Sequence, residues 1–137
     1  MDRIMKDKDI TQTIIGCAMK VHRKLGFGFL ESVYHKALLH ELGKAGLRAE
    51  SEKPIPVFYD GMMVGDFFAD ILVEQKVIVE LKAVEQLSKV HEVQTVNYLA
   101  ATGLDVGLLL NFGTKRLEFK RKFRIPKPNP ENPVNPV

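Results

Sequence analysis

The stretch FFADILVEQKVIVELKA, residues 67–83, decides the fold that this sequence can adopt. Two apolar runs flank the polar triplet at 74–76, which is the pattern of two strands joined by a tight turn. If Val73 closes against Val77, the hairpin register follows, because a slip of one residue would put charges into an apolar face. One face then pairs Ile71 with Val79 and Ala69 with Leu81, and the other pairs Leu72 with Ile78, Asp70 with Glu80 and Phe68 with Lys82.

Three polar residues, Asp70, Glu80 and Lys82, interrupt the second of these faces. Directly opposed residues have Cβ atoms about 4.5–5.5 Å apart, and two like charges at that distance are destabilising. A hard divalent cation such as Mg²⁺ or Mn²⁺ would remove the conflict, because such ions prefer oxygen ligands. The alternative is that both carboxylates are merely exposed, with Lys82 as an ion-pair partner.

The rest of the chain predicts an α/β fold with a mixed β-sheet flanked by helices, in the order α-α-β-β-β-α-β-β. Helical spacing of apolar residues and strand-like alternation carry this assignment. The caps that we expect are Asp9 and Gly26 around the first helix, and Ser88 and Gly103 around the third. The predicted helices are 9–25, 29–43 and 88–102, and the predicted strands are 55–59, a second running to about 73 after an Asp60-Gly61 turn, 77–83, 106–111 and 117–123.

The helix at 88–102 carries a polar stripe of His91, Gln94 and Tyr98. We expect apolar positions elsewhere on this helix to supply its buried face, which would leave the stripe free for a site. The expected buried positions are Val90, Val93, Val96, Leu99 and Ala100.

Composition bounds the function classes. Residues 1–125 are expected to form a single domain, whereas the prolines of 126–137 predict an extended or disordered tail. No apolar run approaches the ~20 residues that cross a membrane, and Cys17 is the only cysteine, so we expect a cytoplasmic protein. Residues 115–127 hold seven Lys or Arg and one Glu, a charge of +6 that suits phosphate contact or a solvated edge strand.

The residues Asp70 and Glu80-x-Lys82 resemble the signature of PD-(D/E)XK nucleases, with Ala69 where that signature has proline. The stretch from Gly28 through Glu31 to Tyr34, GFLESVY, is similar to the motif of the GxxExxY family, which is assigned to the same superfamily. Gln94 and Tyr98 resemble the QxxxY element of exonuclease-like members. The resemblance covers roughly residues 10–124.

The resemblance implies a restriction-endonuclease-like core and a metal-dependent nuclease. Mg²⁺ or Mn²⁺ would be held by Asp70, Glu80, the carbonyl of Leu81 and Glu31, and Lys82 would act on the attacking water. Contacts to nucleic acid, DNA rather than RNA, are assigned to Gln94, Tyr98 and Tyr34, and to Lys120 and Lys122 of the basic stretch, although structural support is the favoured role for Tyr34. Three other functions stay open: a catalytically inactive nucleic-acid-binding module, a subunit that acts only with a partner, and a hydrolase of another phosphodiester such as a nucleotide. The protein could also form a homodimer.

Overall fold

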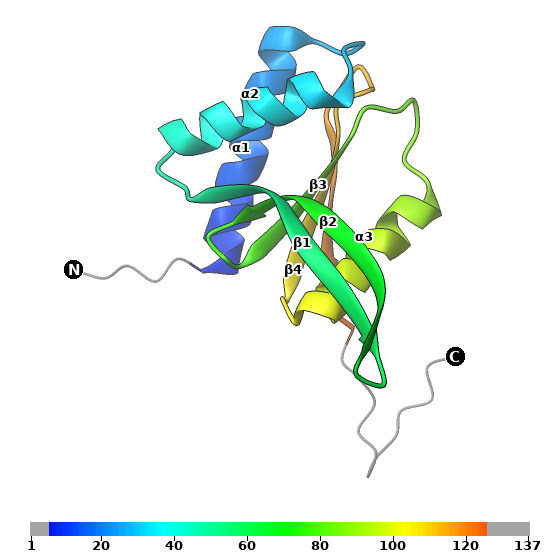
Figure 1. The fold of residues 1–137 in the computed structure, drawn as a ribbon. Helices are drawn as coiled ribbons and strands as arrows, with labels where there is room; N and C mark the ends of the chain where they lie inside the picture. The colour runs from blue at the N-terminus through cyan, green and yellow to red at the C-terminus, as the bar shows by residue number, and fades with distance from the viewer. Residues whose placement is uncertain (1–5, 126–137) are drawn as a thin grey trace, which may run out of the picture.

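The protein is described from a computed structural model, in which residues 6–125 are described (Figure 1). Three helices and five strands follow one another in the predicted order, α-α-β-β-β-α-β-β. The elements are α1 (Asp7–Leu25), α2 (Glu31–Lys44), β1 (Ala49–Tyr59), β2 (Met62–Val73), β3 (Val77–Lys82), α3 (Lys89–Thr102), β4 (Val106–Asn111) and β5 (Glu118–Phe123).

The five strands form one sheet in the order β1-β2-β3-β4-β5. Strands β3 and β4 are parallel, and the other neighbours are antiparallel. A parallel pair cannot be joined by a tight turn, and here α3 makes the crossover between β3 and β4. The predicted mixed sheet is confirmed.

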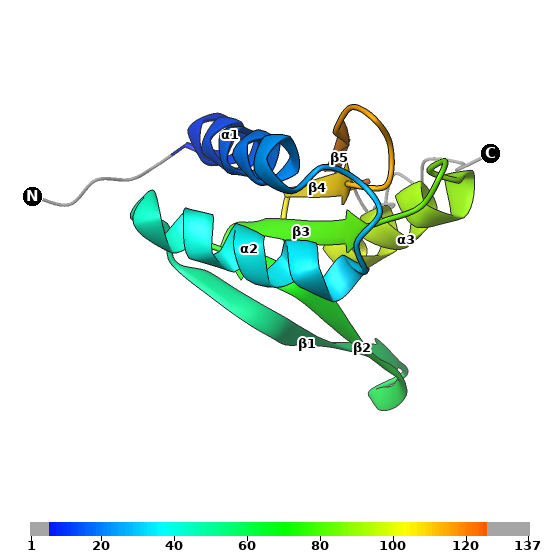
Figure 2. The same cartoon turned by 90° about the horizontal axis from the view of Figure 1, so that it is seen from above.

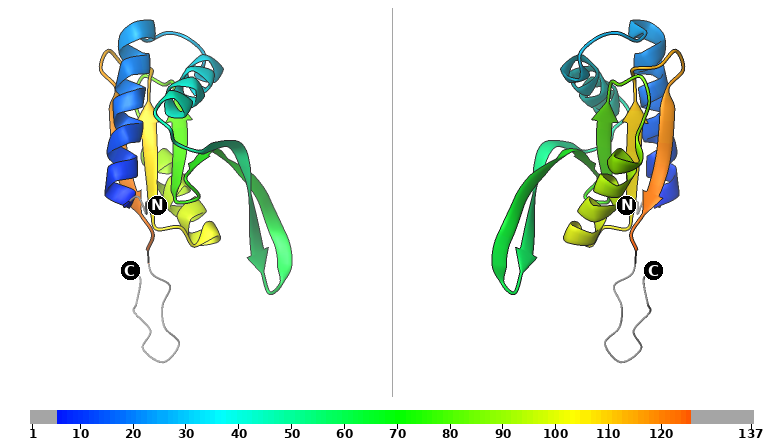
Figure 3. Two further views of the ribbon diagram at one scale, coloured as in Figure 1. Left: turned by 90° about the vertical axis from the view of Figure 1, so that its left-hand side faces the viewer. Right: turned by 90° about the vertical axis from the view of Figure 1, so that its right-hand side faces the viewer.

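Helices cover both faces of the central sheet, with α1 and α2 on one side and α3 on the other (Figure 3). The cluster beneath α1 and α2 includes Val77, Val79 and Leu81 of β3, whereas Ile78 of the same strand packs against Leu99 of α3. All six residues of β4 are buried. This double coverage explains why β3 and β4 are almost continuously apolar.

The β1–β2 hairpin is longer than predicted and projects away from the rest of the sheet (Figures 2 and 3). The sequence predicts the first strand at 55–59, but β1 begins at Ala49, because Ala49 and the polar residues Glu50, Ser51 and Lys53 are held by pairing with β2 rather than by full burial. Both residues of the predicted turn, Asp60 and Gly61, have positive φ angles of 50° and 75°. This conformation matches the twist of a two-residue hairpin.

Three of the four predicted helix caps are confirmed. Gly26 and Gly103 end α1 and α3, and the Ser88 hydroxyl accepts a hydrogen bond from the backbone N–H of His91. The prediction that Asp9 caps α1 is wrong, because the helix begins at Asp7 after Lys6. Asp9 instead lies in the first turn, where a negative charge favours the helix dipole.

Of the predicted buried positions of α3, Leu99 is confirmed, but Val90, Val93 and Ala100 are exposed and Val96 is only partly buried. Val90 and Val93 are 73% and 52% exposed, whereas Thr95, Tyr98 and Leu99 are buried. The cause lies in β4, where Gly107 has no side chain: a Cβ built there would lie 3.0 Å from Thr95 Cγ2 and 3.6 Å from Leu99 Cδ1. The helix therefore packs through Thr95 and Leu99 and turns its valines outward.

No helix among residues 6–125 is both long and apolar enough to span a membrane. The predicted proline-rich tail at 126–137 lies outside the described residues. The assignment of residues 1–125 to one domain stays a prediction.

Replacing the α3 cap tests its contribution to stability. Ser88→Ala removes the side-chain acceptor of the His91 N–H and leaves only the Ser88 carbonyl, and we expect it to lower the free energy of unfolding by about 1 kcal/mol in urea denaturation. The matched control is Ser32→Ala, an exposed first-turn serine of α2, with an expected change within about 0.5 kcal/mol. Equal effects of the two substitutions would contradict a capping role.

Candidate active site

Strands β2 and β3 separate where the acidic residues occur. The predicted register is confirmed at Ile71–Val79, Leu72–Ile78 and Val73–Val77, and the ladder between these two strands ends there. The Asp70 carboxylate instead accepts a hydrogen bond from the Leu81 N–H at 2.7 Å, and the Glu80 carboxylate accepts one from the Asp70 N–H at 2.8 Å. These side chains thus replace backbone pairing and lie in the gap between the strands.

The predicted strand pairs beyond Ile71 are therefore not formed as ladder partners. Ala69, expected on the face of Ile71 and Leu81, packs in the other cluster with Leu72 and Ile78. The ladder between β1 and β2 is also interrupted here, and Glu52 of β1 has a φ of 54°. Such a distortion of the paired strands breaks the strict alternation of faces on which the prediction relied.

Burial makes the paired carboxylates difficult to ionise. Glu80 is only 5% exposed, and burial, followed by the nearby charge of Asp70, raises its pKa to about 8. Burial also raises the pKa of Asp70, against the hydrogen bond from the Leu81 N–H. The positive charge of Lys82 acts in the opposite direction on both carboxyl groups, which places this lysine beside them.

Glu31, the first residue of α2, faces the same site. Partial burial raises the pKa of Glu31, the negative charge of Asp70 raises it further, and the positive charge of Lys82 lowers it. Among residues 6–125, however, no set of three or more His, Cys, Asp or Glu side chains is gathered closely enough to hold a metal ion. Glu31 as a metal ligand therefore stays a prediction, as does the carbonyl of Leu81.

The donor set of Asp70 and Glu80 fits a small divalent cation. Each carboxylate accepts one backbone N–H, which leaves further lone pairs for an ion. Their mutual repulsion and their burial both penalise two bare negative charges. An ion with hard oxygen preference, such as Mg²⁺ or Mn²⁺, would offset both penalties.

A family model described as "PD-(D/E)XK nuclease superfamily" matches residues 8–122. The chain belongs to the PD-(D/E)XK nuclease superfamily. Proteins of this superfamily are usually nucleases, and divalent metals such as Mg²⁺ or Mn²⁺ are their usual cofactors.

One similar solved structure is described as "Crystal structure of SSO0001". It is 19% identical, with a TM-score of 0.50, and the match covers 69% of this chain and 50% of that one. The chain thus spans about half the length of that protein, and the likeness concerns the fold alone. A comparison with curated proteins finds no match.

In this PD-(D/E)XK protein, α3 brings Gln94 and Tyr98 to the carboxylates. Gln94 Nε2 donates a hydrogen bond to the Tyr98 hydroxyl at 2.8 Å. Burial raises the pKa of Tyr98, and the charge of Glu80 raises it further, so the ring lies within electrostatic reach of the site. His91, from the same stripe, is occupied in the capping box with Ser88.

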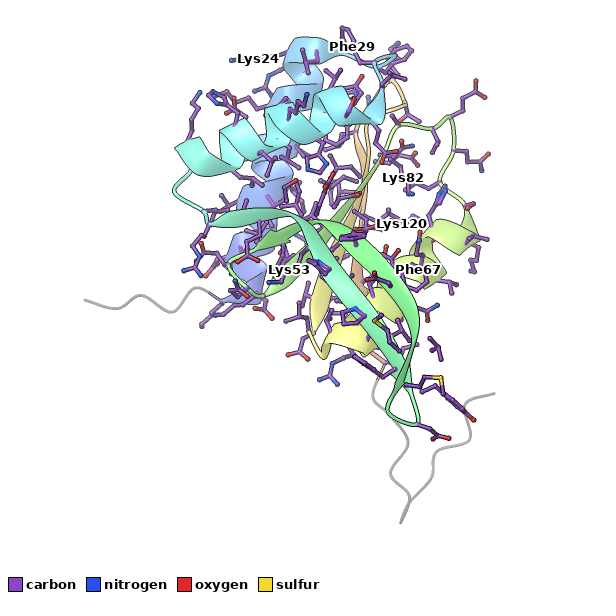
Figure 4. The ribbon with its side chains drawn as sticks, viewed as in Figure 1. Lys24, Phe29, Lys53, Phe67, Lys82 and Lys120 are labelled. Carbon is purple, nitrogen blue, oxygen red and sulfur yellow. The ribbon has the colours of Figure 1, made fainter. Side chains whose placement is uncertain are left out.

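Sequence reasoning missed one aromatic side chain beside the site, Phe67 of β2. Its ring centroid lies 5.8 Å from that of Tyr98. Figure 4 labels Phe67 and Lys82 on β2 and β3, with α3 running beside them. The signal was present as an aromatic residue three positions before Asp70, but the strand prediction could not say that Phe67 would meet α3.

Tyr34 is a core residue, which corrects its assignment to substrate contact. Its side chain has no exposed surface, and its ring stacks on Phe112 with centroids 4.7 Å apart. The hydroxyl donates to the Gly26 carbonyl at 2.7 Å and accepts from the Phe29 N–H at 3.2 Å. Tyr34 thus ties down the turn that leads into Glu31 and cannot reach a ligand.

The two lysines assigned to nucleic acid are paired with an acidic residue of α3. Lys120 and Lys122 of β5 lie 3.1 Å and 2.9 Å from the Glu92 carboxylate. Hydrogen bonds from Lys122 and Lys120 lower the pKa of Glu92. The lysines therefore stabilise α3 against the sheet, and their contact with phosphate stays a prediction.

The raised pKa of Glu80 predicts the pH dependence of stability in metal-free protein. The folded state keeps a proton on Glu80 up to about pH 8, whereas the unfolded chain loses it near the ordinary value of 4.5. The folded state thus binds more protons between these values, and stability falls as pH rises, with a limiting slope of about 1.4 kcal/mol per pH unit. We expect Glu80→Gln to flatten this fall in chemical denaturation measured in EDTA from pH 5 to 8. An unchanged slope in the variant would show that Glu80 is not the titrating group.

Tyr34→Phe tests the structural role of that hydroxyl. Because the Gly26 carbonyl and Phe29 N–H would lose their partner, we expect a loss of about 1–3 kcal/mol in the free energy of unfolding. Tyr59→Phe, at a tyrosine that is 69% exposed, is the matched control and should change stability by less than about 0.5 kcal/mol. A Tyr34→Phe protein as stable as the control would argue against this role.

Proposed function

We propose that this protein is a metal-dependent nuclease that hydrolyses phosphodiester bonds of nucleic acid, with DNA as the preferred polymer. The observation that carries the proposal is the pair of half-buried Asp70 and buried Glu80 in the gap between β2 and β3, with Lys82 beside it. A carboxylate pair of this kind is costly to a fold that makes no use of it.

Asp70 and Glu80 are the proposed ligands of Mg²⁺ or Mn²⁺, joined by the Leu81 carbonyl and by Glu31. When bound, the ion would polarise a phosphoryl oxygen and lower the pKa of a water molecule. Asp70 is oriented for this role by the Leu81 N–H, and Glu80 by the Asp70 N–H. These two hydrogen bonds fix the carboxylates before any ligand arrives, which reduces the reorganisation needed for binding.

Lys82 and α3 supply the remaining roles. The Lys82 ammonium group would stabilise the attacking hydroxide and the negative charge that develops on the phosphoryl oxygens. Gln94 would orient the substrate phosphate, since its amide already contacts Tyr98 beside the carboxylates. In-line attack would form a P–O bond to the water oxygen as the P–O bond to the leaving oxygen breaks, and the proton that the water gives up would be balanced by one taken up from solvent by the leaving oxygen.

Three finer assignments belong to the same proposal. Membership of the GxxExxY family is supported by GFLESVY at 28–34, in which Glu31 faces the site and Tyr34 secures the preceding turn. A cytoplasmic location is supported by the single free cysteine, Cys17. Preference for DNA over RNA is tested by offering both polymers in one assay.

The decisive experiment compares cleavage by Lys82→Ala and by wild type. We expect wild-type protein with Mn²⁺ to cleave plasmid, linear or single-stranded DNA, and Lys82→Ala to lower the rate about 100-fold or more, because charge stabilisation in the transition state is lost. Lys36→Ala, at an exposed lysine of α2, is the matched control and should cleave like wild type.

Calorimetric titration of Mn²⁺ separates a nuclease from an inactive binding module. We expect one site in wild type, and binding weakened at least tenfold in Asp70→Asn. Wild-type protein that binds DNA without Mn²⁺, and cleaves neither DNA nor RNA above the Lys82→Ala background, would refute the enzyme and favour the module.

A further inference from the structure

A groove of about 810 Å³ lies between α3 and the projecting β1–β2 hairpin. Phe58 and Phe67 line it from the hairpin, Val90 and Val93 from α3, and Tyr98 from the end nearest the carboxylates. The two valines line it because α3 is seated by Thr95 and Leu99 on Gly107. An opening of this size is in the range of small-molecule binding sites.

The lining is mostly apolar, with three aromatic rings and no charged side chain. Its polar side chains are Gln94, Asn97 and the tip of Tyr98. Gln94 donates one of its N–H groups to the Tyr98 hydroxyl. Asn97 is exposed, and its side chain has no hydrogen-bond partner among the described residues. Aromatic faces combined with the free amide group of Asn97, in a lining without a cation, suit a flat, neutral ligand with hydrogen-bonding edges rather than a phosphate.

Tyr98 links the groove to the candidate active site, since it lines the groove and lies within electrostatic reach of the carboxylates. The Phe67 ring packs against the Tyr98 ring, and the charges of Glu80 and Asp70 raise the pKa of the Tyr98 hydroxyl. A nucleic-acid strand with a phosphate at the carboxylates would therefore place a neighbouring base at the mouth of the groove. Lys82 of β3 lies on the strand side of the same site (Figure 4), where it would contact the phosphate.

We propose that this groove binds an unpaired nucleobase next to the scissile phosphate, so that the preferred substrate is single-stranded or carries an unpaired end. The inference rests on the proposed function in that the strand is the substrate of that site. A base within a duplex is stacked on both faces and paired along its edge, so it cannot enter without leaving the helix. Stacking on Phe58 and Phe67 would tolerate any base, because every base has a flat face.

Other occupants fit the groove less well. Strand pairing of a peptide along the open edge of β1 is disfavoured, because Pro54 and Pro56 have no N–H group to donate. The competing occupant is a second copy of this chain. Its hairpin tip could enter the groove, because the tip carries exposed Tyr59 and Met62, which do not line the groove themselves. That competitor is distinguished by the test.

The test measures fluorescence anisotropy of labelled dT12 and of a 12-base-pair duplex with the full chain, in EDTA and in Ca²⁺. We expect the single strand to bind at least tenfold more tightly than the blunt duplex. Phe58→Leu should weaken single-strand binding about 5- to 150-fold, the range of one base–aromatic stack, whereas Phe58→Trp should retain it. Phe123→Leu is the matched control, because Phe123 of β5 has the same 62% exposure and lies outside the groove.

Two results would overturn the inference. One is equal affinity of Phe58→Leu and wild type for dT12, with circular dichroism showing both folded. The other is a dimer by light scattering that becomes a monomer in Phe58→Leu, which would assign the groove to a second copy. If only the groove assignment is wrong, wild-type protein still cleaves and Lys82→Ala still lowers the rate. If only the nuclease assignment is wrong, no cleavage is observed, but binding of dT12 still depends on Phe58.

Discussion

The site depends on two hydrogen bonds between acidic side chains and the backbone of the neighbouring strand. Leu81 donates to Asp70, and Asp70 donates to Glu80, where the antiparallel ladder would otherwise continue. Continued pairing would satisfy the same backbone groups without any carboxylate. The separation of β2 and β3 therefore holds two acids at a fixed place, and burial of Glu80 next to Asp70 raises the Glu80 pKa because a second bare negative charge there is unfavourable.

The end of β3 is secured from the opposite side by a buried asparagine. Asn111 of β4 is fully buried, accepts hydrogen bonds from the Val84 and Gly113 N–H groups, and donates to the Val84 carbonyl and to Glu118. The Phe112 N–H also donates to the Lys82 carbonyl at 2.8 Å. The backbone on both sides of Lys82 is thus bound to β4, so the lysine projects from a rigid strand end, as precise chemistry requires.

The orientation of α3 links the carboxylates to the groove. Thr95 and Leu99 seat the helix on β4, which brings Tyr98, with Gln94 bonded to its hydroxyl, within electrostatic reach of Glu80 and exposes Val90 and Val93 to the hairpin. The same packing lets Glu92 meet Lys120 and Lys122. One contact between a helix and a strand therefore positions polar residues for the site, apolar residues for the groove, and an ion pair that neutralises part of the basic strand.

By itself, the sequence determined the order of the elements, the turns at 60–61 and 74–76, and the three acidic and basic residues on neighbouring strands, because alternation, helical spacing and turn residues are local properties of the chain. Tertiary structure alone decided that Ala69 changes cluster, that Tyr34 is buried on Phe112, and that α3 turns its valines outward. These outcomes depend on which surface each residue meets, such as the space above Gly107, and residues distant in the chain create that surface. A period of 2 or 3.6 residues shows that a face is apolar but not what will cover it.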